Sequence, residues 1–74
     1  MGKLPCPAGK EMVRFLVRQG FVCVRINGSH HYMEKGPIHT SVPVHKHDLR
    51  TGTLRGILHD IRMKPEEFEK LWRD

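Results

Sequence analysis

The sequence predicts an α+β domain with the order α-β-β-β-α and a three-stranded antiparallel sheet, followed by a short C-terminal helix. Apolar residues recur at helical spacing over residues 9–19 and again over residues 54–61. Between these segments lie three short runs with strand character, separated by turn-forming glycines. Because 74 residues suffice for one modest core, we expect a single domain over residues 1–74.

The first helix is expected over Gly9–Gln19. One of its faces carries Met12, Phe15, Leu16 and Gln19. The prolines at positions 5 and 7 keep the preceding residues extended. Gly20 can adopt the left-handed conformation that ends a helix.

The three expected strands are Phe21–Ile26, Ser29–Lys35 and Ile38–Val44. Asn27-Gly28 is a strong hairpin signal between the first two strands, and Gly36-Pro37 provides the second turn. Such short connections make consecutive strands antiparallel neighbours. Because Pro43 has no N–H to donate, the third strand is expected to lie at a sheet edge or to end there.

The second helix is expected to be capped by Thr51 or Thr53. Its buried stripe consists of Leu54, Ile57, Leu58 and Ile61. Pro65 fits the first turn of a short last helix. The apolar side of that helix consists of Phe68, Leu71 and Trp72. We expect the helices to cover one face of the sheet and to leave the other face partly open.

The chain is basic, with 13 Lys and Arg against eight Asp and Glu, a formal net charge of +5 and a pI near 9.7. Residues 1–59 carry nine basic and three acidic side chains, whereas residues 60–74 carry four and five. A basic body of this kind indicates a polyanionic partner such as RNA. On charge alone, a protein that is merely basic remains the alternative.

Several function classes find no support in the sequence. No apolar stretch approaches the ~20 residues of a membrane span and no signal-peptide core is visible, so we expect no membrane contact and a cytoplasmic location. Cys6 and Cys23 form no paired motif and are expected to be inert thiols. Their spacing with the histidines fits no structural zinc pattern, so no metal or other cofactor is expected.

Histidines are the most informative residues, because five of the six fall between positions 30 and 47. Imidazole can move a proton in either direction near neutral pH. His30 follows a tight turn that would fix it at the start of a strand, and His31 should point to the opposite sheet face. For a histidine in a strand, a purely structural role is the commoner alternative. His45 follows the third strand closely, whereas His39 and His47 are expected on the surface.

RNA cleavage is a reaction that one such histidine supports with little else. RNA carries its own nucleophile, the 2′-OH, so the enzyme needs a base, a cation to stabilise the phosphorane charge, and no metal. DNA lacks the 2′-OH, and we expect no direct DNA binding by this chain alone. The candidate RNA contacts are Arg25, Lys46, Arg50 and Arg55.

Four short pieces, in their order and spacing, give the chain a resemblance to the HicA toxins of bacterial and archaeal toxin–antitoxin pairs. The pieces are Gly20-Phe21, Gly28-Ser29-His30-His31, Val42-Pro43-Val44-His45, and Gly52-Thr53-Leu54 with Ile57-Leu58. The resemblance covers nearly the whole chain. It departs from the family pattern at His59, where a Lys is expected, and in the fuller tail from Pro65 to Asp74.

The resemblance implies a fold like the double-stranded RNA-binding domain and cleavage of messenger RNA without the ribosome. It implies that the catalytic histidine falls on His30, and no other residue is carried over as catalytic. Gly28 keeps the turn, and Ser29 and His45 are candidate supporting residues, although the sequence leaves open whether His31 or His45 assists. It also implies a HicB antitoxin, which we expect to cover the face that bears His30.

Two other functions stay open on the sequence. A non-catalytic RNA-binding module of the same fold would explain the charge but not the placement of His30. A pure protein-interaction domain would show no salt-sensitive binding of RNA.

Overall fold

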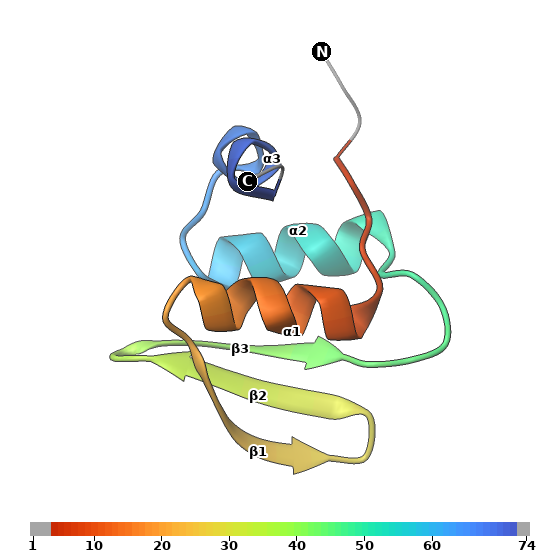
Figure 1. Cartoon of the computed structure of the whole chain (residues 1–74), viewed down its shortest axis with the longest axis vertical. Coiled ribbons are helices and arrows are strands. Elements are labelled where there is room, and N and C mark those ends of the chain that lie inside the picture. The colour runs from red at the N-terminus through yellow and green to blue at the C-terminus, as the bar shows by residue number, and fades with distance from the viewer. Residues whose placement is uncertain (1–3, 73–74) are drawn as a thin grey trace.

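A computed structural model describes residues 4–72 and confirms the expected order of elements (Figure 1). The helices and strands are α1 (Gly9–Arg18), β1 (Val22–Asn27), β2 (His30–Lys35), β3 (Ile38–Pro43), α2 (Thr51–Asp60) and α3 (Pro65–Trp72). The strands form one antiparallel sheet in the order β1-β2-β3, so β2 is its central strand.

Helices α1 and α2 lie on the same face of the sheet, and α3 lies on the side of the helices away from the strands (Figure 1). The core between these layers consists of Met12, Phe15, Leu16, Phe21, Met33, Val42, Leu49, Leu54, Ile57, Leu58, Ile61 and Phe68. None of the elements formed by residues 4–72 covers the opposite face of the sheet. The expectation of one covered and one open face is therefore confirmed.

An aromatic cluster joins α3 to α1. The ring centroids of Phe15 and Phe68 are 5.1 Å apart with the ring planes at 83°, an edge-to-face arrangement. The Trp72 ring lies 5.6 Å from Phe15 and 5.4 Å from Phe68. The C-terminal helix thus completes the core with the apolar side that the sequence predicts.

The two ends of α1 are stabilised by local hydrogen bonds. The Glu11 carboxylate accepts the Ala8 N–H at 3.0 Å, which satisfies one free donor at the start of the helix. At the other end Gly20 has φ 98°, as expected for a left-handed stop. The Phe21 N–H donates back to the Leu16 carbonyl at 2.9 Å. Phe21 therefore belongs to the helix stop, and β1 begins one residue later than predicted.

The first hairpin turn also lies one residue later than predicted. Asn27 pairs with His30, so the two-residue loop is Gly28-Ser29 and not Asn27-Gly28. Gly28 has φ 61° at the first loop position, where a type II′ turn requires glycine. The third strand ends at Pro43 on the sheet edge, as its missing N–H predicts.

A β-bulge in β1 was not predicted. The register shifts between Cys23, which pairs with Met33, and Arg25, which pairs with Tyr32. Residues two apart in a regular strand point to the same face, and the extra residue Val24 breaks this rule. As a result Cys23 lies on the helix side of the sheet and Arg25 on the open side.

The prediction of a threonine cap for α2 is wrong. The N-cap residue is Arg50, which is extended and makes no side-chain capping bond. The preceding Leu49 is buried, and its N–H donates to the Pro7 carbonyl at 2.8 Å. This tertiary contact sets where the chain enters the helix, so Thr51 is already the first helical residue.

Candidate active site

His30 is the first residue of the central strand, and its side chain is exposed. It stands in register with Asn27 of β1 and with Pro43 of β3. The Gly28-Ser29 turn directly precedes it. The backbone at His30 is thus fixed from both sides while the imidazole remains accessible.

The two adjacent histidines of β2 address different surroundings. Met33 is fully buried beneath the helices, and His31 lies half-buried on the same face. His30 and Tyr32 lie on the open face. Of these two histidines, His30 is therefore the one that lies on the uncovered side of the sheet.

The loop after β3 begins directly beside this turn. The Val44 N–H donates to the Ser29 carbonyl at 2.7 Å. The following residues His45, Lys46 and His47 are exposed. Together with Ala8, Lys10 and Val44 they line a shallow depression of about 890 Å³. The depression is basic and borders the backbone that positions His30.

Gly9 allows the start of α1 to approach the end of β3. A Cβ atom at this position would collide with the Pro43 carbonyl oxygen and would lie 2.8 Å from the Val44 Cα. On its other side the loop is held by a bridge between Ala8 and Asp48. The loop that carries His45 and Lys46 is therefore attached to α1, to the lead-in before it, and to the first hairpin.

The residues expected to contact RNA are divided between different surfaces. The Arg25 guanidinium carbon lies 4.4 Å from the centroid of the Tyr32 ring, on the same sheet face as His30. Lys46 lines the basic depression, and Arg50 is exposed just before α2. Arg55, by contrast, lines a separate depression of about 410 Å³. That depression is formed by Arg55, Leu58, His59, Arg62, Met63, Lys64 and Pro65.

Residues 4–72 contain no group of three or more His, Cys, Asp or Glu side chains placed to hold a metal ion. Both cysteines are free; Cys6 is half-buried and Cys23 is exposed. Within the same part of the chain no helix is long and apolar enough to cross a membrane. His30 and His45 carry imidazoles, Lys46 an ammonium group and Arg25 a guanidinium, and such groups are suited to proton transfer beside a phosphate.

Two candidate residues were missed from the sequence, Tyr32 and Lys10. Strict alternation along β2 places Tyr32 on the face of His30, so the signal was present in the strand pattern. Lys10 reaches the depression only because α1 packs against the end of β3. No sequence pattern predicts the contact between α1 and β3.

Residues 9–63 match the family model described as the HicA toxin of bacterial toxin–antitoxin systems. No curated protein shows significant similarity to the chain. The family match covers α1, the sheet, the loop after β3 and α2, and it ends before α3. Every residue of the basic depression from Lys10 onward lies inside it.

Proposed function

Because the chain belongs to the HicA toxin family, a family of toxins that have a cognate antitoxin, we propose that it is a metal-independent endoribonuclease that cleaves messenger RNA through His30. One observation carries the proposal: an exposed imidazole at a strand start that is fixed by pairing on both sides. The order of elements agrees with the double-stranded RNA-binding-domain-like fold of this family.

In the proposed reaction His30 takes the proton of a ribose 2′-OH. The 2′-oxygen attacks the adjacent phosphorus, and the bond from phosphorus to the 5′-oxygen of the next nucleotide breaks. The products are a 2′,3′-cyclic phosphate and a 5′-OH, so the proton balance requires one group to donate to the leaving oxygen. DNA has no 2′-OH and is not cleaved by this route.

Two groups on the loop after β3 complete this mechanism, and two residues of the turn between β1 and β2 support the site. His45 is the candidate donor to the leaving oxygen, because its loop is bonded to the turn before His30. Lys46 supplies a positive charge for the phosphorane. Ser29 supports the site through its backbone carbonyl, which accepts the Val44 N–H. Gly28 supports it through the positive φ of the turn.

The first test compares His30→Ala with His31→Ala, a matched change at the neighbouring position on the other sheet face. General acid–base catalysis contributes about 10²–10⁴-fold, so cleavage of an unstructured RNA should fall by that factor in His30→Ala. Affinity for the RNA should stay nearly constant, because phosphate contacts remain. Cleavage by His30→Ala at the wild-type rate would show that His30 is not the catalytic base.

A second substrate tests the chemistry itself. An RNA with a single 2′-deoxynucleotide on the 5′ side of the scissile phosphate should resist cleavage at that bond and be cut normally elsewhere. Cleavage at the modified bond would exclude attack by the 2′-oxygen. If the wild-type chain binds RNA with salt sensitivity but never cuts it, the chain is a non-catalytic RNA-binding module.

For the cognate antitoxin, we propose a HicB-type protein that covers the sheet face carrying His30 and Arg25. The basic charge of the chain favours an acidic partner. A structure of the complex with this face open would contradict the proposal.

A further inference from the structure

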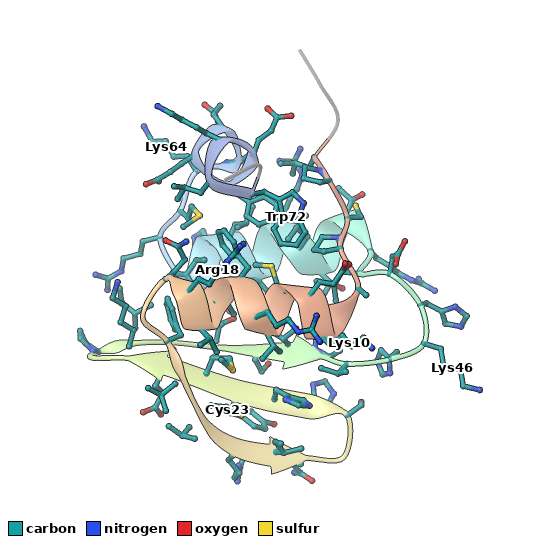
Figure 2. The ribbon with its side chains drawn as sticks, viewed as in Figure 1. Lys10, Arg18, Cys23, Lys46, Lys64 and Trp72 are labelled. Atoms are coloured by element: carbon teal, nitrogen blue, oxygen red, sulfur yellow. The ribbon has the colours of Figure 1, made fainter. Side chains whose placement is uncertain are left out.

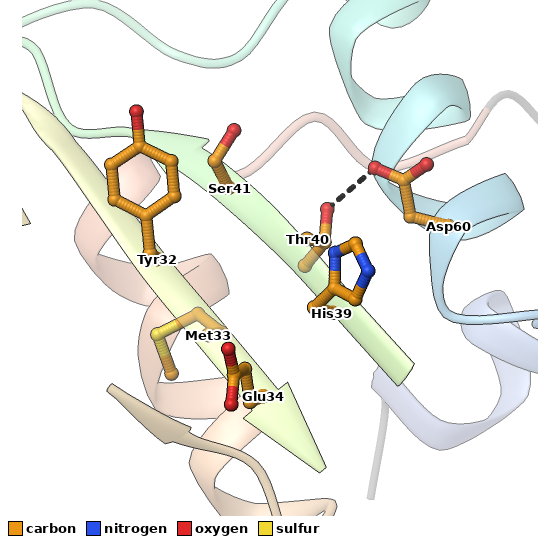
Figure 3. A pocket seen from close by; sticks show the side chains of 7 residues that line it. All are labelled: Tyr32, Met33, Glu34, His39, Thr40, Ser41 and Asp60. Carbon is orange, nitrogen blue, oxygen red and sulfur yellow. Dashed lines mark hydrogen bonds between the residues drawn. The ribbon is translucent and has the colours of Figure 1, made fainter. Parts of the chain in front are cut away.

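A third depression, of about 260 Å³, lies on β2 and β3 (Figure 3). It is lined by Tyr32, Met33, Glu34, His39, Thr40, Ser41 and Asp60. Tyr32 pairs with Ser41, and Glu34 pairs with His39, so these four side chains share the open sheet face. Asp60 reaches the depression from the end of α2 (Figure 3).

One wall of the depression is an aromatic ring that is only partly buried. Arg25 lies over Tyr32 at 4.4 Å, and Tyr32 also lines the depression, so its ring contacts the guanidinium and still borders open space. Unpaired RNA bases are commonly bound by stacking on aromatic rings and guanidinium planes. This wall therefore fits a flat heteroaromatic ligand.

The other walls carry groups that accept hydrogen bonds. A carboxylate such as that of Glu34 or Asp60 is an acceptor. Ser41 can accept or donate, and the His39 imidazole offers both an acceptor and a donor. Asp60 sits at the C-terminal end of α2, where the helix dipole disfavours a carboxylate. It accepts the Thr40 hydroxyl at 2.8 Å, which fixes it beside β3 (Figure 3). Thr40 faces the helices, so Asp60 lies on the helix side of β3, and Glu34 is the carboxylate beside Tyr32 on the open face. A carboxylate there favours a ligand that donates hydrogen bonds and does not favour a phosphate.

The position relative to His30 connects the depression to the proposed reaction. Tyr32 follows His30 by two residues on the same face of one strand, a step of about 7 Å. A nucleotide whose phosphate lies at His30 can therefore place a neighbouring base at Tyr32.

We propose that this depression is a nucleobase subsite, which stacks an unpaired RNA base on Tyr32 and selects bases that carry an exocyclic amino group. Adenine, cytosine and guanine offer such a donor to a carboxylate, and uracil does not. The subsite rests on the proposed function, because it assumes that the phosphate is cleaved at His30. Glu34 and Tyr32 are specificity-determining residues in this assignment.

The test uses an RNA pool with a randomised unstructured segment and sequencing of the new ends. The wild-type chain should cut preferentially where an amino-bearing base occupies one fixed position next to the cleaved bond. In Glu34→Gln the ratio of cleavage next to amino-bearing bases to cleavage next to uracil should fall about fivefold or more. The reason is that one good contact to a base edge discriminates between bases by at least roughly this factor. Tyr32→Leu should raise KM at all sites, whereas Tyr32→Phe should keep the stacking and the preference.

Glu66→Gln, a matched change at an exposed carboxylate on α3, is the control and should leave the cleavage pattern unchanged. An unchanged pattern in Glu34→Gln and an unchanged KM in Tyr32→Leu, with cleavage still dependent on His30, overturn the subsite alone. An altered pattern in Glu34→Gln together with full cleavage by His30→Ala overturns the proposed catalyst and leaves the subsite in place.

A binding measurement covers the case in which the wild-type chain does not cleave RNA. The His30→Ala chain should bind oligo(A) or oligo(C) more tightly than oligo(U). Adding Glu34→Gln should lower the ratio of these affinities about fivefold or more. Equal affinities for the three oligonucleotides overturn the subsite. So does the finding that Glu34→Gln weakens only the complex with the antitoxin, which would make the depression a site for a basic side chain of that protein.

Discussion

At the scale of single residues, Gly9 connects the fold to the proposed chemistry. It is buried at the first position of α1, where any side chain would meet the backbone of Pro43 and Val44. Backbone atoms cannot move aside as a flexible side chain can. Overpacking of this kind costs about 1–3 kcal/mol, whereas alanine gains at most about 1 kcal/mol of helix propensity over glycine.

We therefore expect Gly9→Ala to lower the free energy of unfolding by about 2 kcal/mol, measured by urea denaturation. RNA cleavage should fall as well, because the displaced loop carries His45 and Lys46. Gly56→Ala is the control: apart from its chain neighbours and the backbone of its own helix, nothing comes within 4 Å of its Cβ position, and it should raise stability by up to ~1 kcal/mol. A Gly9→Ala chain as stable as the wild type would show that α1 and β3 are not in such close contact.

At the scale of elements, α3 lies outside the family match yet contributes to the core (Figure 2). Phe68 is fully buried against Phe15, and Trp72 packs on both.

Truncating a buried phenylalanine costs about 3–5 kcal/mol, a large share of the roughly 5–10 kcal/mol expected for a small domain. Phe68→Ala should thus shift the urea midpoint strongly, whereas Lys70→Ala on the exposed side should change stability by less than about 0.5 kcal/mol. Equal urea midpoints for the two variants would show that the packing of α3 does not contribute to the stability of the domain.

The sequence was sufficient for the features that depend on local pattern. Helical and strand periodicity, the stop at Gly20 and the break at Pro43 were all predicted, because each depends on a few neighbouring residues. The bulge at Val24 and the start of α2 were not, since they depend on packing between distant segments.

The same distinction between local pattern and distant packing applies to the residues of the candidate site. His30 was predicted from the turn before it and from the family resemblance. The subsite was not predicted, because α2 brings Asp60 to Thr40 across 20 residues of sequence, where no local pattern records the contact. Tyr32 lies between these cases: its strand position was readable, but its stacking on Arg25 depends on the bulge in β1.

At the scale of the whole molecule, positive charge is distributed over more than one surface. Lys46 lies on the loop beside the first hairpin, while Arg55, Arg62 and Lys64 line the depression between α2 and α3. An RNA strand that crosses the sheet at His30 need not pass over the second surface. Under the proposed function, the net charge of +5 does not give the number of cations that contact the RNA.

The salt dependence of RNA binding shows which of the two surfaces contacts RNA, the loop that carries Lys46 or the depression lined by Arg55. For single-stranded RNA the logarithm of the binding constant falls with the logarithm of salt concentration by about 0.7 per neutralised phosphate. On the His30→Ala background, Lys46→Ala should reduce that slope by about 0.7, because one phosphate contact is lost. Arg55→Ala removes the same charge from the other depression and should leave the slope unchanged. Fluorescence anisotropy of a labelled unstructured RNA over a series of KCl concentrations measures both slopes. Equal reductions in the two variants would mean that the RNA path continues over α2, and the substrate face would then extend well beyond the open side of the sheet.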